Sequence, residues 1–160
     1  MMTAEEKNYL RRLAERFAVL SARPEERDKA SLCLAHNELE TTRPVVFVFP
    51  FTCWKELHHD FQPVFDDPLL REVEYYLVRG IYAAEHLKDD NPLEPRIPVY
   101  LSINYAGLEL KKKISKSGQA DGPLHFEPVL NSEADLEKIR FGGAHVDREA
   151  CWAAFAQVKD

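Results

Sequence analysis

The sequence contains no long apolar run. A helix needs about 20 consecutive apolar residues to cross a bilayer, and no stretch of this chain approaches that length. The opening stretch, MMTAEEKNYLRRL, is charged and has no apolar segment of the kind found in signal peptides. We therefore expect neither a membrane span nor secretion, and we predict a cytoplasmic protein.

Cysteine is also scarce. The three cysteines, Cys33, Cys53 and Cys151, are odd in number and widely spaced. A small secreted domain held together by disulfides usually carries an even number of cysteines. The pattern fits free thiols in a reducing cytoplasm better than it fits a disulfide framework.

Positive charge is in short supply. Lys and Arg total 21 against 27 Asp and Glu, which gives a formal net charge of -6. Binding to phosphates requires a positive surface, so a nucleic-acid partner is not expected. The one basic run, which comprises Lys111, Lys112, Lys113 and Lys116, is typical of a solvated loop. With 45% apolar and 30% charged residues, the composition is that of a globular chain able to bury a core.

Familiar catalytic and metal-binding motifs are missing as well. The sequence has no GxSxG, HExxH or P-loop pattern. Cys33 and His36 are spaced like a pair of metal ligands, but no second pair lies nearby. His58 and His59 are adjacent, so on a helix their side chains would point apart. We therefore expect no metal or other cofactor in this chain.

Periodic spacing of apolar residues predicts helices at residues 3–22, 24–39 and 68–87. In the last of these, Asp67 supplies an N-cap acceptor and Pro68 suits the first turn. The apolar residues of this helix recur at steps of three and four and comprise Leu70, Val73, Leu77, Ile81 and Ala84. The helices at residues 3–22 and 68–87 should each bury one face, whereas the apolar stripe of the helix at 24–39, Ala30 and Leu34, is weaker.

Two apolar runs predict strands that are covered on both faces. Residues 45–49, VVFVF, are continuously apolar and end at Pro50, and residues 97–103, IPVYLSI, form the second run. A helix in the connection implies that the strands are parallel and joined by a right-handed crossover. Such a pair leaves both outer edges unpaired, so we expect the opening of a larger sheet.

After Gly107 the pattern favours shorter elements. The stretch LELKKKI predicts a short strand or hairpin arm, and LHFEPVL predicts an extended segment. Ser132 and Asp135 resemble a capping box for a short helix, and Asp147 is placed to cap a last helix. The chain is thus expected to be of the α/β class, as a single domain or a fragment of one.

Three stretches resemble, in order and spacing, the N-terminal third of uroporphyrinogen-decarboxylase-like proteins: RPVVFVFPFTCWKEL, DDPLLREVEYYLVRGIYAAEHLKDDNPLEPRIPV and DGPLHFEPVLNSEADLEKIRF. The resemblance is to the divergent bacterial branch related to corrinoid-dependent methyltransferases. It implies a TIM (β/α)8 barrel of roughly twice this length or more. Residues 1–40 would be an N-terminal helical extension. Residues 41–160 would be the first strands and helices, the opening βαβ portion of a barrel that is incomplete in this chain.

The resemblance also suggests where a substrate would bind. Barrel enzymes place their sites at the C-terminal ends of strands, which selects Trp54 after the first strand and Ser102, Asn104 and Tyr105 after the second. Uroporphyrinogen decarboxylases carry an arginine-rich loop and an aspartate at these points, but this chain has FPFTCWKEL and SINYAG. Both replacements remove groups that a polycarboxylate tetrapyrrole would need, so catalytic residues stay unassigned.

Intact relatives act on tetrapyrroles or in corrinoid-dependent methyl transfer, and the methyltransferases draw zinc ligands from later strands. The resemblance therefore implies a tetrapyrrole or corrinoid-protein partner for a completed protein, and a chain that is catalytically incomplete alone. The alternative is a self-contained small α/β module that binds a partner or forms a homo-oligomer through its exposed sheet edge. A small stand-alone enzyme is a third hypothesis, but its site would lack a titratable base.

Overall fold

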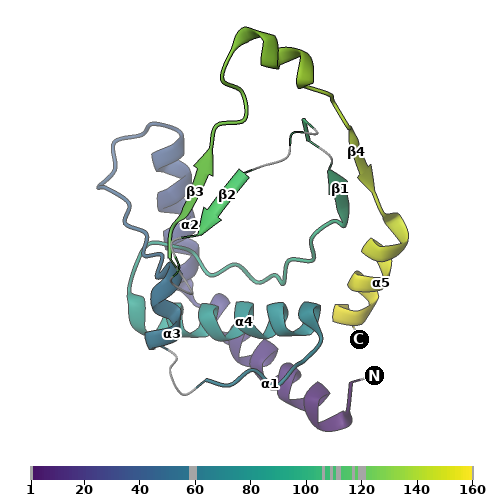
Figure 1. Ribbon diagram of the computed structural model, residues 1–160. Coiled ribbons are helices and arrows are strands. Elements are labelled where there is room, and N and C mark those ends of the chain that lie inside the picture. The colour runs from purple at the N-terminus through teal and green to yellow at the C-terminus, as the bar shows by residue number, and fades with distance from the viewer. Residues whose placement is uncertain are drawn as a thin grey trace. The chain divides into compact units, whose positions relative to one another are not determined.

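The computed structural model describes residues 2–57, 61–105, 107–108, 110, 113–116, 118 and 122–159. By its internal contacts the chain divides into two compact units, Met1–Pro98 and Val99–Asp160. The first unit is built from helices, and the second contains short strands (Figure 1). This mixture of helix and strand agrees with the predicted α/β class. No helix within the described ranges is both long and apolar enough to cross a membrane.

The helices of the first unit are α1 (Ala4–Ser21), α2 (Pro24–Asn37), α3 (Trp54–Leu57) and α4 (Pro68–Tyr82). A 3-10 turn, η1 (Phe51–Cys53), precedes α3, and a π-helical turn, η2 (Ala83–Leu87), continues α4. The helices predicted from apolar spacing are therefore confirmed, and the one predicted for residues 68–87 is formed by α4 and its π-helical continuation η2.

Local sequence signals determine where these helices begin. At the start of α1, Thr3 and Glu6 form a capping box in which each side chain accepts a bond from the other residue's backbone N–H. At the start of α4, the Asp67 side chain accepts from the Leu70 N–H at 3.0 Å, as predicted. Lys88 adopts a left-handed φ of 48° and ends the π-helical turn.

The core of the first unit is the contact between α1 and α4. Phe17 and Leu20 are buried on α1. On α4 the buried apolar residues are Leu70, Val73, Leu77 and Ile81. The centroids of the Phe17 and Tyr76 rings lie 5.5 Å apart, and Gly80 makes room for this packing, because a Cβ there would lie 2.5 Å from Phe17 Cε2. The predicted apolar stripe of α4 thus faces the core.

The first predicted strand does not form a ladder. Residues 45–49 pair with no strand in the described chain, and the side chains at positions 46–49 are between 40% and 60% exposed. The prediction assumed that both faces of this apolar run are covered, and the exposed side chains show that they are not. The carboxylates of Asp89 and Asp90 bond its backbone where a neighbouring strand would otherwise do so.

The second unit contains two antiparallel, two-stranded sheets. In one sheet β1 (Ile103–Tyr105) pairs with β4 (Ala144–Val146). In the other, β2 (Lys113–Lys116) pairs with β3 (Leu124–Glu127). The predicted hairpin arm and extended segment are confirmed as β2 and β3. The turn-rich stretch expected between them lies mostly outside the described residues.

The remaining elements of the second unit begin at the predicted caps. The 3-10 helix η3 (Glu133–Lys138) begins with a capping box between Ser132 and Asp135. The Lys138 ammonium, together with N–H donors of the preceding loop, holds the pKa of Asp135 well below its ordinary value. The last helix, α5 (Arg148–Lys159), is preceded by Asp147, whose carboxylate accepts from the Ala150 N–H at 3.0 Å.

The second predicted strand is mostly wrong. Of residues 97–103, only Ile103 belongs to a strand, and that strand pairs antiparallel with β4. The boundary between the two units falls after Pro98, inside the predicted strand, and proline has no N–H to donate to a ladder. The β1–β4 pairing, in contrast, uses only residues of the second unit. The predicted parallel βαβ unit therefore does not form among the described residues.

Candidate functional site

The residues predicted to bind a substrate fall in different units. Trp54, the first residue of α3, belongs to the first unit, whereas Ser102, Asn104 and Tyr105 belong to the second. Each unit also contains a hollow beside these residues. The two hollows differ in the polar groups that line them, and this difference decides which one is the better binding site.

In the second unit, the predicted residues lie along β1 and the segment leading into it. The Ser102 N–H donates to Cys151 Sγ at 3.1 Å, which joins this segment to α5. Asn104 lies opposite His145 in the sheet, and the Tyr105 side chain is 73% exposed. These residues form a paired strand with backbone contacts to a helix. Among the described residues of this unit, no cluster of three His, Cys, Asp or Glu side chains lies beside Ser102, Asn104 or Tyr105.

An apolar groove of about 410 Å³ lies in the second unit beside α5. It is lined chiefly by Tyr100, Leu101, Val146, Cys151, Trp152 and Phe155. The Trp152 and Phe155 rings pack edge to face, with centroids 6.0 Å apart. Arg148 is the charged residue of its lining. The groove offers apolar contact, but its lining has no carboxylate or imidazole.

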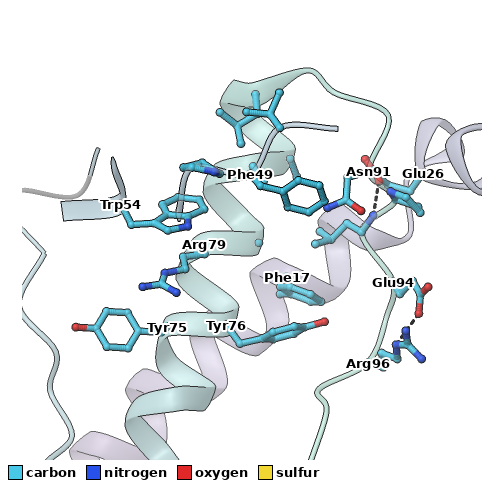
Figure 2. A pocket seen from close by; sticks show the side chains of 18 of the residues that line it. Phe17, Glu26, Phe49, Trp54, Tyr75, Tyr76, Arg79, Asn91, Glu94 and Arg96 are labelled. Atoms are coloured by element: carbon cyan, nitrogen blue, oxygen red, sulfur yellow. Dashed lines mark hydrogen bonds and ion pairs between the residues drawn. The ribbon is translucent and has the colours of Figure 1, made fainter. Parts of the chain in front are cut away.

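A larger cavity of about 940 Å³ lies in the first unit beside Trp54 (Figure 2). Its aromatic lining comprises Phe17, Phe49, Phe51, Trp54, Tyr75 and Tyr76. The cavity is framed by α4 and by residues 48–51, which include the end of the 45–49 segment that was predicted to be a buried strand. An aromatic lining of this size is typical of sites that bind small organic molecules.

Arg79 projects from α4 between the rings of Trp54 and Tyr75 (Figure 2). Its Cζ atom lies 5.4 Å from the centroid of the Trp54 ring and 4.8 Å from that of Tyr75, within the range of cation–π attraction. Across the described part of the chain, no carboxylate forms an ion pair with this guanidinium. Stacking therefore holds the group in place and leaves its in-plane N–H donors for an acceptor.

Arg79 belongs to a second stripe on α4 that sequence analysis missed. Tyr75, Arg79 and Tyr82 on α4 and His86 on η2 recur at steps of four, three and four, on the helix side opposite the buried aliphatic face. The Tyr82 ring packs edge to face on Trp54 at 5.9 Å and lies 4.6 Å from the His86 ring. This spacing was visible in the sequence. The prediction of this helix used only the spacing of its aliphatic residues, which lie on the other side.

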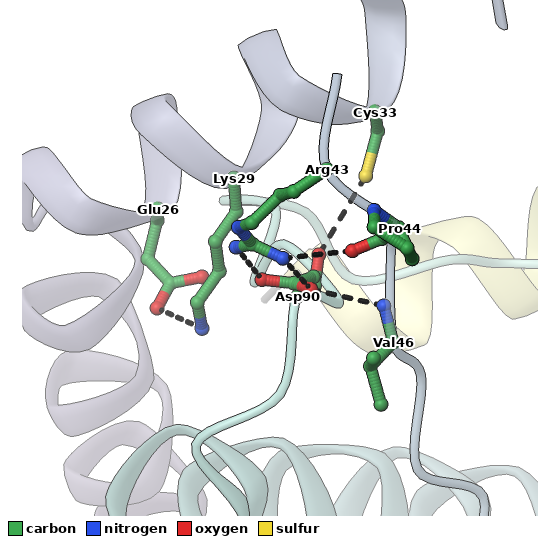
Figure 3. A network of polar contacts seen from close by, with 7 residues as sticks. All are labelled: Glu26, Lys29, Cys33, Arg43, Pro44, Val46 and Asp90. Carbon is green, nitrogen blue, oxygen red and sulfur yellow. Dashed lines mark hydrogen bonds and ion pairs between the residues drawn. The ribbon is translucent and has the colours of Figure 1, made fainter. Parts of the chain in front are cut away.

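A polar network near the cavity organises the extended 45–49 segment (Figure 3). Asp90 accepts from both arms of the Arg43 guanidinium and from the Val46 N–H at 2.9 Å. The Arg43 bonds, followed by the Val46 bond, hold the pKa of Asp90 well below its ordinary value. Asp89 accepts from the Val48 N–H at 2.9 Å. These carboxylates have a structural role, because they satisfy backbone donors that would otherwise lack a partner.

The residues considered as metal ligands do not converge. Cys33 Sγ lies 3.6 Å from the Asp90 carbonyl oxygen, whereas His36 Nδ1 lies 3.5 Å from Thr42 Oγ1. Within the described ranges, no group of three His, Cys, Asp or Glu side chains is placed to hold a metal ion. His58 and His59 lie outside the described residues.

Comparison with known proteins gives no match, whether to a family model, to a curated protein or to a solved structure. The family of this chain is accordingly a proposal that rests on its own residues. The candidate site rests on the contacts around Trp54 and Arg79.

Proposed function

We propose that this chain is the N-terminal part of a uroporphyrinogen-decarboxylase-like protein of the branch related to corrinoid-dependent methyltransferases. In the completed barrel, residues 45–49 would be the first strand and α4 the first outer helix. The complete protein would act on a tetrapyrrole or in corrinoid-dependent methyl transfer. This chain alone would be catalytically inactive.

The observation that carries the proposal is the state of the 45–49 segment. The backbone N–H groups of the segment alternate between bonded and open. Those of Val46 and Val48 donate to Asp90 and Asp89. For Val45, Phe47 and Phe49, no acceptor within the described chain bonds the N–H. The segment therefore has one occupied edge and one open edge, and its apolar side chains are exposed. An open apolar edge is a feature expected of a barrel strand that lacks its neighbour.

The side chains near the proposed strand ends explain why the isolated chain would be inactive. Trp54, Ser102, Asn104 and Tyr105 offer stacking and hydrogen bonding, but none is a general base near neutral pH. The lining of the 940 Å³ cavity contains three carboxylates, Glu26, Glu72 and Glu94. Glu26 and Glu94 are paired with Lys29 and Arg96 respectively, and Glu72 forms no ion pair with another residue of the described chain. The chemistry of a completed protein would then depend on residues contributed from beyond these segments.

The reading frame of the gene gives the first test. If the proposal holds, codons continuous with codon 160 encode further alternating strands and helices, enough to bring the total to about eight strands. A stop codon at that point, followed by an unrelated gene, would contradict the proposal. The test needs no assumption about substrate.

An activity measurement gives the second test. The purified chain is incubated with uroporphyrinogen and, separately, titrated with cobalamin. We expect no loss of carboxyl groups from the tetrapyrrole and no saturable change in the cobalamin absorbance. A decarboxylated product formed by this chain alone would show that it is catalytically complete, and a saturable complex with cobalamin would show that its binding site is complete. Either result would overturn the proposal.

A second function, self-association through the open edge, is favoured by the same segment. Natural edge strands use charged side chains and proline to prevent pairing with another chain. Residues 45–49 contain neither a charged residue nor a proline. Two copies could pair antiparallel along the open N–H groups of Val45, Phe47 and Phe49. Self-association predicts a mass that rises with the concentration of the chain, whereas the barrel proposal predicts further strands encoded after codon 160.

A further inference from the structure

We propose that the first unit binds a small aromatic carboxylate, with the carboxylate on the Arg79 guanidinium and the ring in the adjoining aromatic cavity. This inference shares Phe49 and Trp54 with the proposed barrel function but depends on Arg79, which that function does not use. Its test can therefore fail while the proposed function stands. It assigns aromatic carboxylates as the ligand class of the 940 Å³ cavity, for which the family resemblance implies no ligand.

The charge at this site comes from Arg79, which differs from the other cationic residues of the cavity lining. Lys29 bonds Glu26 at 2.9 Å and Arg96 pairs with Glu94. Arg71 donates to the Phe65 carbonyl at 2.7 Å. Within the described residues, Arg79 has aromatic neighbours but no oxygen acceptor. A guanidinium with open in-plane donors is suited to a bidentate carboxylate.

The geometry around Arg79 favours a planar acid. The Trp54 and Tyr75 rings lie close to the guanidinium, at 5.4 Å and 4.8 Å from its Cζ atom. They limit approach to the guanidinium's edge, where the N–H donors lie. A carboxylate that binds this edge places the atoms attached to it against the aromatic lining.

The rest of the cavity favours a ligand with an aromatic body over an inorganic anion. Phe49, Phe51 and Tyr76 line the same hollow as Arg79, and Phe51 is 82% exposed while Phe49 is 60% exposed. Covering these rings with an apolar ligand removes their surface from water, which favours binding. Bound phosphate or sulfate would leave these rings exposed to water. The 940 Å³ volume accommodates one or two fused rings.

The test uses 4-fluorobenzoate as the probe and 4-fluorobenzyl alcohol as its uncharged counterpart, both followed by ¹⁹F NMR with the full chain. The indole N–H signals of Trp54 and Trp152 provide a second readout, and Trp152→Phe assigns them. We expect saturable broadening of the 4-fluorobenzoate signal, a shift of the Trp54 indole signal, and binding of the alcohol that is at least about tenfold weaker.

Variants identify the charged partner. Arg79→Gln is expected to weaken 4-fluorobenzoate binding by about tenfold or more and to leave the binding of the alcohol within about twofold. The matched control is Arg96→Gln, which removes another arginine of the same lining and should change the affinity for 4-fluorobenzoate by less than about twofold. If Arg79→Gln does not fold, Arg79→Lys is used, because it keeps the positive charge but removes the planar guanidinium that binds a carboxylate through two N–H groups. Arg79→Lys should weaken 4-fluorobenzoate binding more than Arg96→Lys does.

Three results would overturn the inference. The first is no shift of the Trp54 indole signal at saturating probe. The second is equal affinity for the acid and the alcohol. The third is an Arg79→Gln variant that folds and binds 4-fluorobenzoate as tightly as the original chain.

Discussion

Asp90 accepts both arms of the Arg43 guanidinium, with Nη1 2.7 Å from Oδ2 and Nη2 2.5 Å from Oδ1 (Figure 3). The same carboxylate accepts from the Val46 N–H, and Asp89 accepts from Val48 two residues further along. One edge of the 45–49 segment is therefore held by side chains of a loop. This arrangement explains how an apolar segment stays extended without a strand beside it.

The Arg43–Asp90 pair predicts a dependence of stability on pH. The pKa of Asp90 is lowered by Arg43 and by the Val46 N–H. A lowered pKa in the folded state stabilises the fold above the ordinary carboxylate value near 4, and this contribution is lost as the pH falls through the folded-state value. The free energy of unfolding of Asp90→Asn, measured by urea titration, should therefore be lower than that of the original chain at pH 7, and the difference should shrink below about pH 4.

The control for this prediction is Asp66→Asn, because Asp66 is a fully exposed carboxylate with one long contact to Arg71. It should leave the free energy of unfolding nearly unchanged at both pH values. A gap between Asp90→Asn and the original chain that stays constant from pH 7 to pH 2 would show that the ionised carboxylate is not what holds the segment.

Tyr9 predicts that the free energy of unfolding depends on pH in the opposite direction, at high pH. Burial, followed by a hydrogen bond to the Glu74 carboxylate, raises the pKa of Tyr9 to about 12. A raised pKa means that the neutral phenol stabilises the fold below its ordinary pKa near 10, and that this contribution is lost as the pH rises toward the folded-state value. The stability difference between the original chain and Tyr9→Phe should change between pH 10 and about 12. Parallel curves across that range would contradict the assignment.

The packing of α1 on α4 predicts the effect of a single methyl group. Alanine is intrinsically favoured over glycine in a helix by about 1 kcal/mol, but a Cβ at Gly80 would lie 2.5 Å from the buried Phe17 ring. We expect Gly80→Ala to lower the free energy of unfolding by roughly 1–3 kcal/mol, as overpacking does. In Phe17→Leu, which removes the ring, the same substitution should cost less than in the original chain. Additive effects of the two changes would contradict this contact.

The open edge of the 45–49 segment predicts self-association. Light scattering after size exclusion should show a mass that rises with concentration, and Phe47→Lys should weaken the association by about tenfold or more, because a charge on an edge opposes strand pairing. The matched control is Phe141→Lys. Phe141 is 87% exposed and lies outside the segment, so the same chemical change there should have little effect. A chain that stays monomeric at every concentration, or equal effects of both variants, would contradict pairing through this edge.

The helices were predictable because their signals are local. Asp67 with Pro68, and Ser132 with Asp135, mark helix starts within a few residues of the groups that they cap. The aliphatic stripe of α4 likewise depends only on spacing along one helix. Helix caps and the aliphatic stripe of a helix do not depend on distant parts of the sequence. They are therefore expected whether this chain folds alone or as part of a larger domain.

The strands were not predictable in the same way. Whether residues 45–49 form a ladder depends on a partner far away in sequence, and the apolar run says nothing about where that partner lies. Of the residues predicted to bind a substrate, Trp54 lines a cavity, and its spatial neighbour Arg79 was not among them. Pairing them requires knowing that the turn before α3 brings the indole back onto α4, which no spacing within either segment reveals.

The exchange of the backbone amides at positions 45–49 tests the central claim most directly. Measured by NMR on dilute, monomeric chain, Val46 and Val48 should exchange at least about tenfold more slowly than Val45, Phe47 and Phe49, because only the first two donate to carboxylates. Slow exchange of the whole segment, released only by global unfolding, would mean that both of its edges are paired within this chain. That result would contradict the claim that the segment keeps an open edge for a strand from elsewhere.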